Sequence, residues 1–62
     1  MDSEEQIVAD AATAMSNDEL AAAIATLQAH ERELLLAGDI DRARRAAMDK
    51  AVFLSVQVSR HT

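Results

Sequence analysis

A single glycine, Gly38, interrupts a chain that contains no proline and no second glycine, so little else in the sequence can break a helix. Glycine adopts the left-handed backbone conformation at little steric cost, which makes it common just beyond a helix C-terminus. On both sides of Gly38 the apolar residues recur at the spacing of an amphipathic helix. The sequence therefore predicts helices over residues 17–37 and 40–60 that reverse direction at a hinge of Gly38 and Asp39.

The helix predicted over residues 17–37 has a well-defined start. Ser16 and Glu19 have the spacing of a capping box, in which each side chain hydrogen-bonds the other residue's backbone N–H group. Met15 and Leu20 have the spacing of the hydrophobic staple that often accompanies this box. The larger apolar side chains form one stripe, which we expect to be the core face: Leu20, Ile24, Leu27, Leu34 and Leu35.

The helix predicted over residues 40–60 carries more apolar residues than one neighbouring helix can cover. We expect its inner stripe to consist of Ile40, Ala43, Ala47, Ala51, Leu54 and Val58. A second stripe, on another side, consists of Met48, Val52 and Val56, and Phe53 points in a further direction. Residues 52–58 are rich in β-branched residues and also alternate as a strand would, but the length match with the first helix favours a helix.

A helix that is apolar on several faces is normally buried among several neighbours. We therefore expect the apolar end of the second helix to be the seam of a homodimer or the docking site for another protein. The residues expected in this interface are Met48, Val52, Phe53 and Val56.

The N-terminal segment, residues 1–15, begins with a second capping-box spacing at Ser3 and Gln6 and continues with Ile7 and Val8 at helical spacing. An isolated helix of this length is marginal in water. Two interpretations remain open: a short helix that docks on the rest of the chain, with Ile7 and Val8 in the interface, or a frayed acidic tail.

Glu31 lies in the middle of the predicted core face of residues 17–37, where the pattern requires an apolar residue. In an antiparallel hairpin that turns at Gly38, Glu31 lies across from residues 44–46, so Arg44 is its expected partner. One interpretation is a partly buried pair that fixes the register between the helices. The other is a solvated pair near the hinge, with both charges reaching water along their aliphatic stems.

The size and charge of the chain favour a shared core. A single domain of 62 residues buries only about 60% of the surface that its unfolded chain exposes, and the chain has no cysteine for disulfides or a thiolate metal site. Residues 1–31 hold seven acidic residues and no lysine or arginine, whereas residues 32–62 hold six basic and four acidic residues. No segment has the hydropathy of a membrane span or of a secretion signal, so we expect a cytoplasmic protein.

No combination of residues is typical of an enzyme, and we expect no catalytic, cofactor-binding or metal-binding site. His30 and Glu33 have the spacing of a metal site in helical bundles, but they lie outside the core stripe, so we expect an ordinary solvated histidine. The chain is acidic overall and Phe53 is its only aromatic ring, which argues against nucleic acid as a partner. The one basic cluster consists of Arg42, Arg44, Arg45 and Lys50.

Residues 27–39, followed by Lys50 and Leu54, resemble the helical hairpin of flagellar export chaperones of the FlgN and FliT type. In those proteins an acidic, leucine-rich helix often leads through a Gly-Asp turn into a second helix that carries a lysine. The resemblance covers about half of the chain. It implies a non-enzymatic chaperone that masks an amphipathic helix of an export substrate.

Together these features predict an all-α protein: an antiparallel helical hairpin with a short N-terminal helix, which dimerises into a four-helix-type bundle. The expected function is non-catalytic, that of a small adaptor or chaperone-like regulator that binds another protein through apolar helix faces. The alternative is an acidic inhibitor or antitoxin-like protein that occupies a basic surface. An RNA-binding helical-hairpin dimer is a weaker alternative.

Overall fold

The structure is a computed structural model that describes residues 4–61, and these residues form three α-helices and no strand. The helices are α1, Glu4–Ala14; α2, Asn17–Leu36; and α3, Ile40–His61. The prediction of an all-helical fold is confirmed, and both longer helices begin and end within one residue of their predicted bounds. Residues 52–58 lie inside α3 and are helical. The capping box predicted at Ser3 lies outside the described residues.

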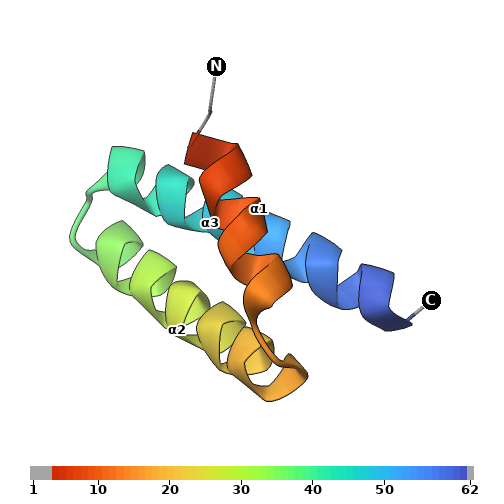
Figure 1. The fold of residues 1–62 in the computed structure, drawn as a ribbon. Helices are drawn as coiled ribbons and strands as arrows, with labels where there is room; N and C mark the ends of the chain where they lie inside the picture. The colour runs from red at the N-terminus through yellow and green to blue at the C-terminus, as the bar shows by residue number, and fades with distance from the viewer. Residues whose placement is uncertain (1–3, 62) are drawn as a thin grey trace.

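The longest helix, α3, connects the other two. It packs against α2, to which a tight turn joins it, and α1 packs across it near its middle (Figure 1). The molecule measures 35 × 30 × 16 Å. Each helix exposes at least one large apolar side chain: Ile7 on α1, Leu36 on α2 and Met48 on α3.

The core lies where all three helices meet. One buried residue comes from each helix: Ala12, Leu20 and Phe53. Partly buried apolar residues pack around them: Val8, Met15, Ala23, Ile24, Leu27 and Val56. The predicted core face of α2 is therefore confirmed for Leu20, Ile24 and Leu27, whereas Leu35, at the far end of α2, is 50% exposed.

The N-terminus of α2 has the predicted capping box. The Ser16 Oγ accepts a hydrogen bond from the Glu19 N–H at 3.1 Å, and the Glu19 Oε1 accepts one from the Ser16 N–H at 2.9 Å. Both bonds satisfy backbone donors that have no partner within the helix. Met15 packs against the cluster that contains Leu20, as the predicted hydrophobic staple requires.

The turn between α2 and α3 is closed by backbone hydrogen bonds around Gly38, which has a φ of 80°. The Gly38 N–H donates to the Leu35 carbonyl at 3.1 Å, and the Asp39 N–H donates to the Leu34 carbonyl at 2.9 Å. These are the two bonds of a Schellman motif, which needs a left-handed residue at the position of Gly38. Asp39 then caps α3, because its Oδ1 accepts a hydrogen bond from the Arg42 N–H at 3.2 Å.

Candidate functional site

The apolar residues of α3 are oriented differently from the prediction. The buried residues of this helix are Ala43, Ala46 and Phe53. Of the predicted inner stripe only Ala43 is buried, whereas Ile40, Leu54 and Val58 are 51%, 38% and 60% exposed. The prediction of this stripe was therefore wrong. The physical reason is that Phe53, the largest apolar side chain, lies where α1 and α2 meet α3, and its burial favours a rotation of α3 that leaves Leu54 outside.

The residues predicted to form an interface with a partner separate into two groups. Phe53 is 9% exposed and belongs to the core of its own chain, and Val8 and Val56 pack against that core. Part of the predicted interface of α3 is therefore in contact with α1 of the same chain. Met48 and Ile7 are 61% and 63% exposed, and Val52 is partly exposed.

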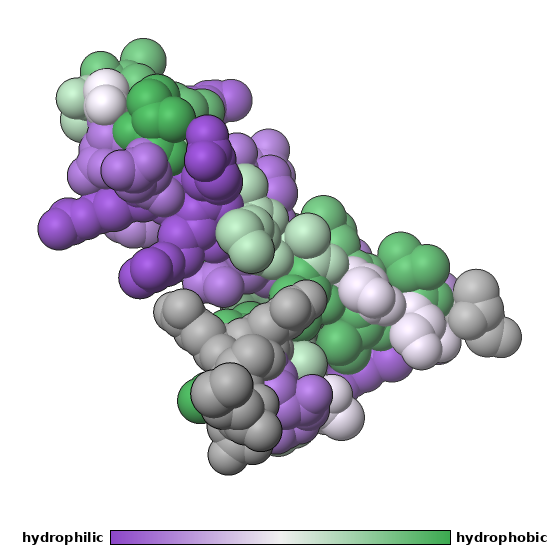
Figure 2. All heavy atoms as spheres, turned by 90° about the horizontal axis from the view of Figure 1, so that it is seen from above, coloured by the Kyte–Doolittle hydropathy of each residue, from purple (hydrophilic) through white to green (hydrophobic). Residues whose placement is uncertain are grey.

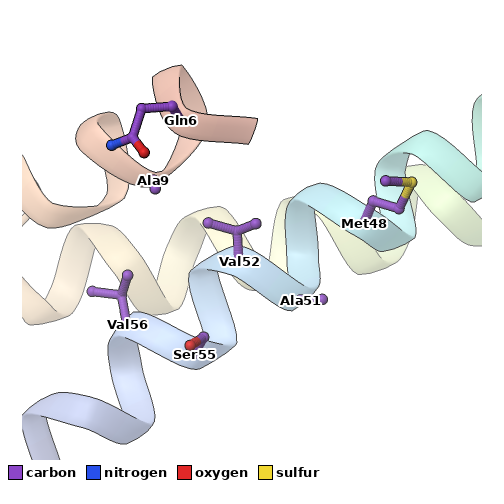
Figure 3. Close-up of a pocket in the computed structure, with 7 residues that line it drawn as sticks. All are labelled: Gln6, Ala9, Met48, Ala51, Val52, Ser55 and Val56. Atoms are coloured by element: carbon purple, nitrogen blue, oxygen red, sulfur yellow. The ribbon is translucent and has the colours of Figure 1, made fainter. Parts of the chain in front are cut away.

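A groove runs between α1 and α3 and has a volume of about 520 Å³ (Figure 3). One wall comes from α1 and the floor from α3. The groove is lined by Gln6, Ala9, Met48, Ala51, Val52, Ser55 and Val56. Of the predicted interface residues, Met48, Val52 and Val56 lie together here, whereas Ile7 does not line the groove. Gln6, which also donates a hydrogen bond to Asp10 at 2.9 Å, and Ser55 are the polar side chains of the lining.

Beside this groove, and sharing Ala51 with it, α3 presents a face whose residues are exposed or only partly buried. We call it the outer stripe of α3 and define it by Ile40, Arg44, Ala47, Ala51, Leu54 and Val58. Four residues that were predicted to face inward are exposed on this stripe: Ile40, Ala51, Leu54 and Val58. Figure 2 shows hydrophobic surface at the end of the molecule that carries the α2–α3 turn and again over the C-terminal half of α3, with hydrophilic surface between them.

Glu31 forms its ion pair with Lys50, not with the predicted Arg44. The Lys50 Nζ lies 2.8 Å from the Glu31 Oε1, and the two side chains are 24% and 22% exposed. Lys50 shares the inner face of α3 with Ala46 and Phe53 by its spacing of four and three residues, so the rotation that buries Phe53 also turns Lys50 toward α2. The same rotation leaves Arg44 exposed.

Arg60, near the end of α3, makes contacts that the sequence analysis did not predict. Its guanidinium donates hydrogen bonds to the backbone carbonyls of Ala12 and Thr13 at 3.4 and 3.0 Å and to the Asn17 Oδ1 at 3.0 Å. These contacts join the C-terminus of α1, where the helix dipole favours a cation, to the start of α2. The one available signal in the sequence was a lone arginine at the end of an apolar helix, which does not specify a partner more than forty residues away.

The described residues were compared with the arrangements that hold a metal ion or span a membrane. Within residues 4–61 no group of three or more His, Cys, Asp or Glu side chains is arranged to hold a metal ion. His30 and Glu33 are both exposed on α2, as are Arg42, Arg44 and Arg45 on α3. None of the helices in this part of the chain combines the length and the hydropathy needed to cross a bilayer.

Comparison with known proteins does not assign the chain to a family. No protein-family model matches the sequence, and neither a curated protein nor a solved structure is similar enough to be matched.

Proposed function

We propose that this protein is a non-catalytic protein-binding module, an adaptor or chaperone-like regulator, that receives an α-helix of another protein in the groove between α1 and α3. The observation that supports the proposal is the groove itself. Its lining is mostly apolar and includes the exposed Met48 and Ala51, and the lining residues of α3 follow one another along that helix from Met48 to Val56 (Figure 3). In helix-in-groove recognition, an amphipathic helix lays its apolar face into a mostly apolar groove.

The charges around the groove define the partner further. Residues 4–31 contain six acidic residues and no lysine or arginine, so the helix that forms one wall has an acidic environment. We therefore expect a partner helix with apolar anchors at i, i+3 or i+4, and i+7, and with lysine or arginine along the edge that faces α1. The resemblance of residues 27–54 to FlgN and FliT chaperones is the reason for proposing a chaperone-like regulator.

A homodimer is part of the proposal. We propose that α2 and α3 act as an antiparallel helical hairpin and that two copies complete a four-helix-type bundle. The support comes from the 16 Å thickness of the molecule and from its exposed apolar residues, among them Leu36 at 83%. A monomer of this size has little core of its own, and association is one of the usual remedies.

The test of partner binding uses two matched substitutions. Ser55→Glu places a charge in the groove, and Thr26→Glu places the same charge on the exposed side of α2. Both positions are exposed helix positions that carry a hydroxyl group, so circular dichroism should show the same helix content for both variants. We expect a partner that co-purifies with the unmodified chain to be lost with Ser55→Glu and retained with Thr26→Glu. Equal retention by both variants would disprove the groove as the binding site.

The acidic inhibitor remains a second candidate because Asp10, Asp18 and Glu19 are exposed and lie on the acidic half of the chain. Salt distinguishes the two functions. Binding to a basic surface weakens steeply as salt concentration rises, whereas apolar docking in the groove changes little. A partner that is released by moderate salt and is insensitive to Ser55→Glu would favour the inhibitor.

A further inference from the structure

The outer stripe of α3 has the spacing of a helix–helix seam. Its residues, at positions 40, 44, 47, 51, 54 and 58, follow one another at alternating intervals of four and three residues. This is the repeat by which one helix packs along another with knobs in holes. Ile40, Leu54 and Val58 are 51%, 38% and 60% exposed, so the rest of the chain covers these three large side chains of the seam only in part.

The side chains of the outer stripe are large at both ends and small in the middle. Ile40 lies at one end, Leu54 and Val58 lie toward the other, and Ala47 and Ala51 lie between them. This order is self-complementary if a second α3 runs in the opposite direction about a two-fold axis at the centre of the stripe. Each Ile40 then lies opposite a Val58, and each Ala47 opposite an Ala51. Alanine at the crossing allows the helix axes to approach to about 8 Å.

Arg44 decides between the two possible directions. In a parallel, in-register pair, Arg44 lies beside Arg44 of the second copy, and these like charges repel each other. In the antiparallel pair the two arginines are separated by about ten residues, or about 15 Å along the axis, which exceeds the screening length of about 8–10 Å at physiological salt. Arg44 then lies beside Leu54 of the second copy, over which its aliphatic stem can pack while the guanidinium stays in water.

From this geometry we infer that the outer stripe of α3 is a self-association surface, on which a second copy of the chain seats its own outer stripe in the antiparallel direction, with Ala47 opposite Ala51. The inference rests on the proposed homodimer and specifies its surface and direction. The stripe shares Ala51 with the lining of the groove, whereas Val52 and Ser55 line the groove and are not part of the stripe. Ser55→Glu therefore tests the groove without changing a residue of the stripe.

The area of the seam sets the strength of the association. From Ile40 to Val58 the stripe rises by about 27 Å along the helix axis, and a helix–helix contact is about 10 Å wide. Its footprint of roughly 270 Å² is well below the roughly 800 Å² per partner of a stable complex. The dimer is therefore reversible and depends on concentration.

Two experiments test the inference, and the first uses the unmodified chain. Sedimentation from about 10 μM to about 1 mM should show the average mass rise from the 6.7 kDa of one chain toward twice that value. A constant mass of 6.7 kDa over this range would overturn both the inference and the proposed homodimer. It would not decide whether a partner binds in the groove, because the Ser55→Glu comparison tests that and does not depend on a dimer.

The second experiment determines the direction by disulfide formation. The chain contains no cysteine, so Ala47→Cys and Ala51→Cys each introduce one thiol without competing ones. We mix isotope-labelled Ala47→Cys with unlabelled Ala51→Cys, oxidise the mixture, and separate mixed from like-with-like dimers by mass. Antiparallel pairing gives mixed dimers in excess of the statistical half. An excess of like-with-like dimers would overturn the antiparallel direction while the homodimer stands.

The matched control is the pair Ala25→Cys and Ala29→Cys. These residues have the same spacing as Ala47 and Ala51 and are exposed on α2, away from the outer stripe. Oxidation of this mixture should give the statistical product. If it gives the same excess of mixed dimers as the α3 pair, disulfide formation does not report the seam and the inference fails.

Discussion

The two ends of the molecule are stabilised in different ways. At the end that carries Ser16, three helices meet and bury one side chain from each, with Phe53 the largest. At the end that carries Gly38 only α2 and α3 meet, and the large apolar residues there are outside: Leu35, Leu36 and Ile40 are 50%, 83% and 51% exposed. We call these the Ser16 end and the Gly38 end.

This difference shows how a chain of 62 residues uses a limited supply of apolar side chains. The supply suffices for one core, and the position of α1 determines where that core forms. The Gly38 end depends on the backbone geometry of its turn and on the Glu31–Lys50 pair farther along the helices. Regions with few buried apolar contacts open most easily, so we expect the Gly38 end to be the less protected one.

The largest loss of stability is expected when the core of the Ser16 end loses its largest side chain. Phe53→Ala should cost about 3–5 kcal/mol, which is a large part of the stability of so small a domain, so that variant should be largely unfolded. Leu36→Ala, at the Gly38 end, should change the free energy of unfolding by about 0.5 kcal/mol or less, because Leu36 is 83% exposed. Urea titration followed by circular dichroism measures both. Equal losses would show that the two ends do not differ in the proposed way.

The second effect concerns the Gly38 end itself. Gly38→Val should cost about 1–2 kcal/mol or somewhat more, because a β-branched residue at a φ of 80° is strained. Crowding does not contribute, since none of the described residues, apart from the two adjacent in the chain, has an atom within 4 Å of a Cβ at this position. The control is Gly38→Asn, because asparagine accepts the left-handed conformation more readily and should cost less. Thermal unfolding compares the two variants, and full stability of Gly38→Val would contradict the turn.

How far the sequence predicts this fold depends on the range of the interaction. The Ser16 capping box and the Gly38 turn are formed by residues within five positions of one another. The box was predicted from the spacing of Ser16 and Glu19, and the turn from the single glycine between two helical patterns. The length and the helical state of α3 were predicted as well. Such local features follow from backbone hydrogen bonding, which adjacent residues determine.

The rotation of α3 could not be predicted in the same way. Both apolar stripes of this helix fit a neighbouring helix, and only the position of α1 makes burial of Phe53 more favourable than burial of Leu54. The ion pair of Glu31 depends on the same rotation, which is why Lys50 replaces the expected Arg44. For the candidate site, the sequence identified Met48, Val52 and Val56 as a group, but it did not reveal that α1 forms the other wall.

A third and smaller effect tests how α1 is held at the Ser16 end. Arg60→Met keeps the aliphatic stem and removes the hydrogen bonds to Ala12, Thr13 and Asn17. We expect a loss of about 1 kcal/mol and faster hydrogen exchange of the α1 amides. The matched control is Arg45→Met, at an exposed position of α3. If both variants exchange at the same rate in α1, Arg60 does not hold this helix in place.

The smallest effect is a dependence on pH at the Ser16 end. Hydrogen bonds from the Ser16 backbone N–H and, next, from its side chain hold the pKa of Glu19 below its usual 4.5. Because folding lowers this pKa, the contribution of the ionised carboxylate to stability is complete above a pH of about 4.5 and is lost as the pH falls through the folded value. Glu19→Gln keeps a capping residue that does not titrate.

The difference in thermal midpoint between the unmodified chain and Glu19→Gln should therefore shrink from about pH 7 to about pH 3. The difference for Gly38→Asn should stay nearly constant, because the bonds of that turn join backbone groups. A Glu19→Gln difference that does not change with pH would mean that the charge of Glu19 adds nothing to the box.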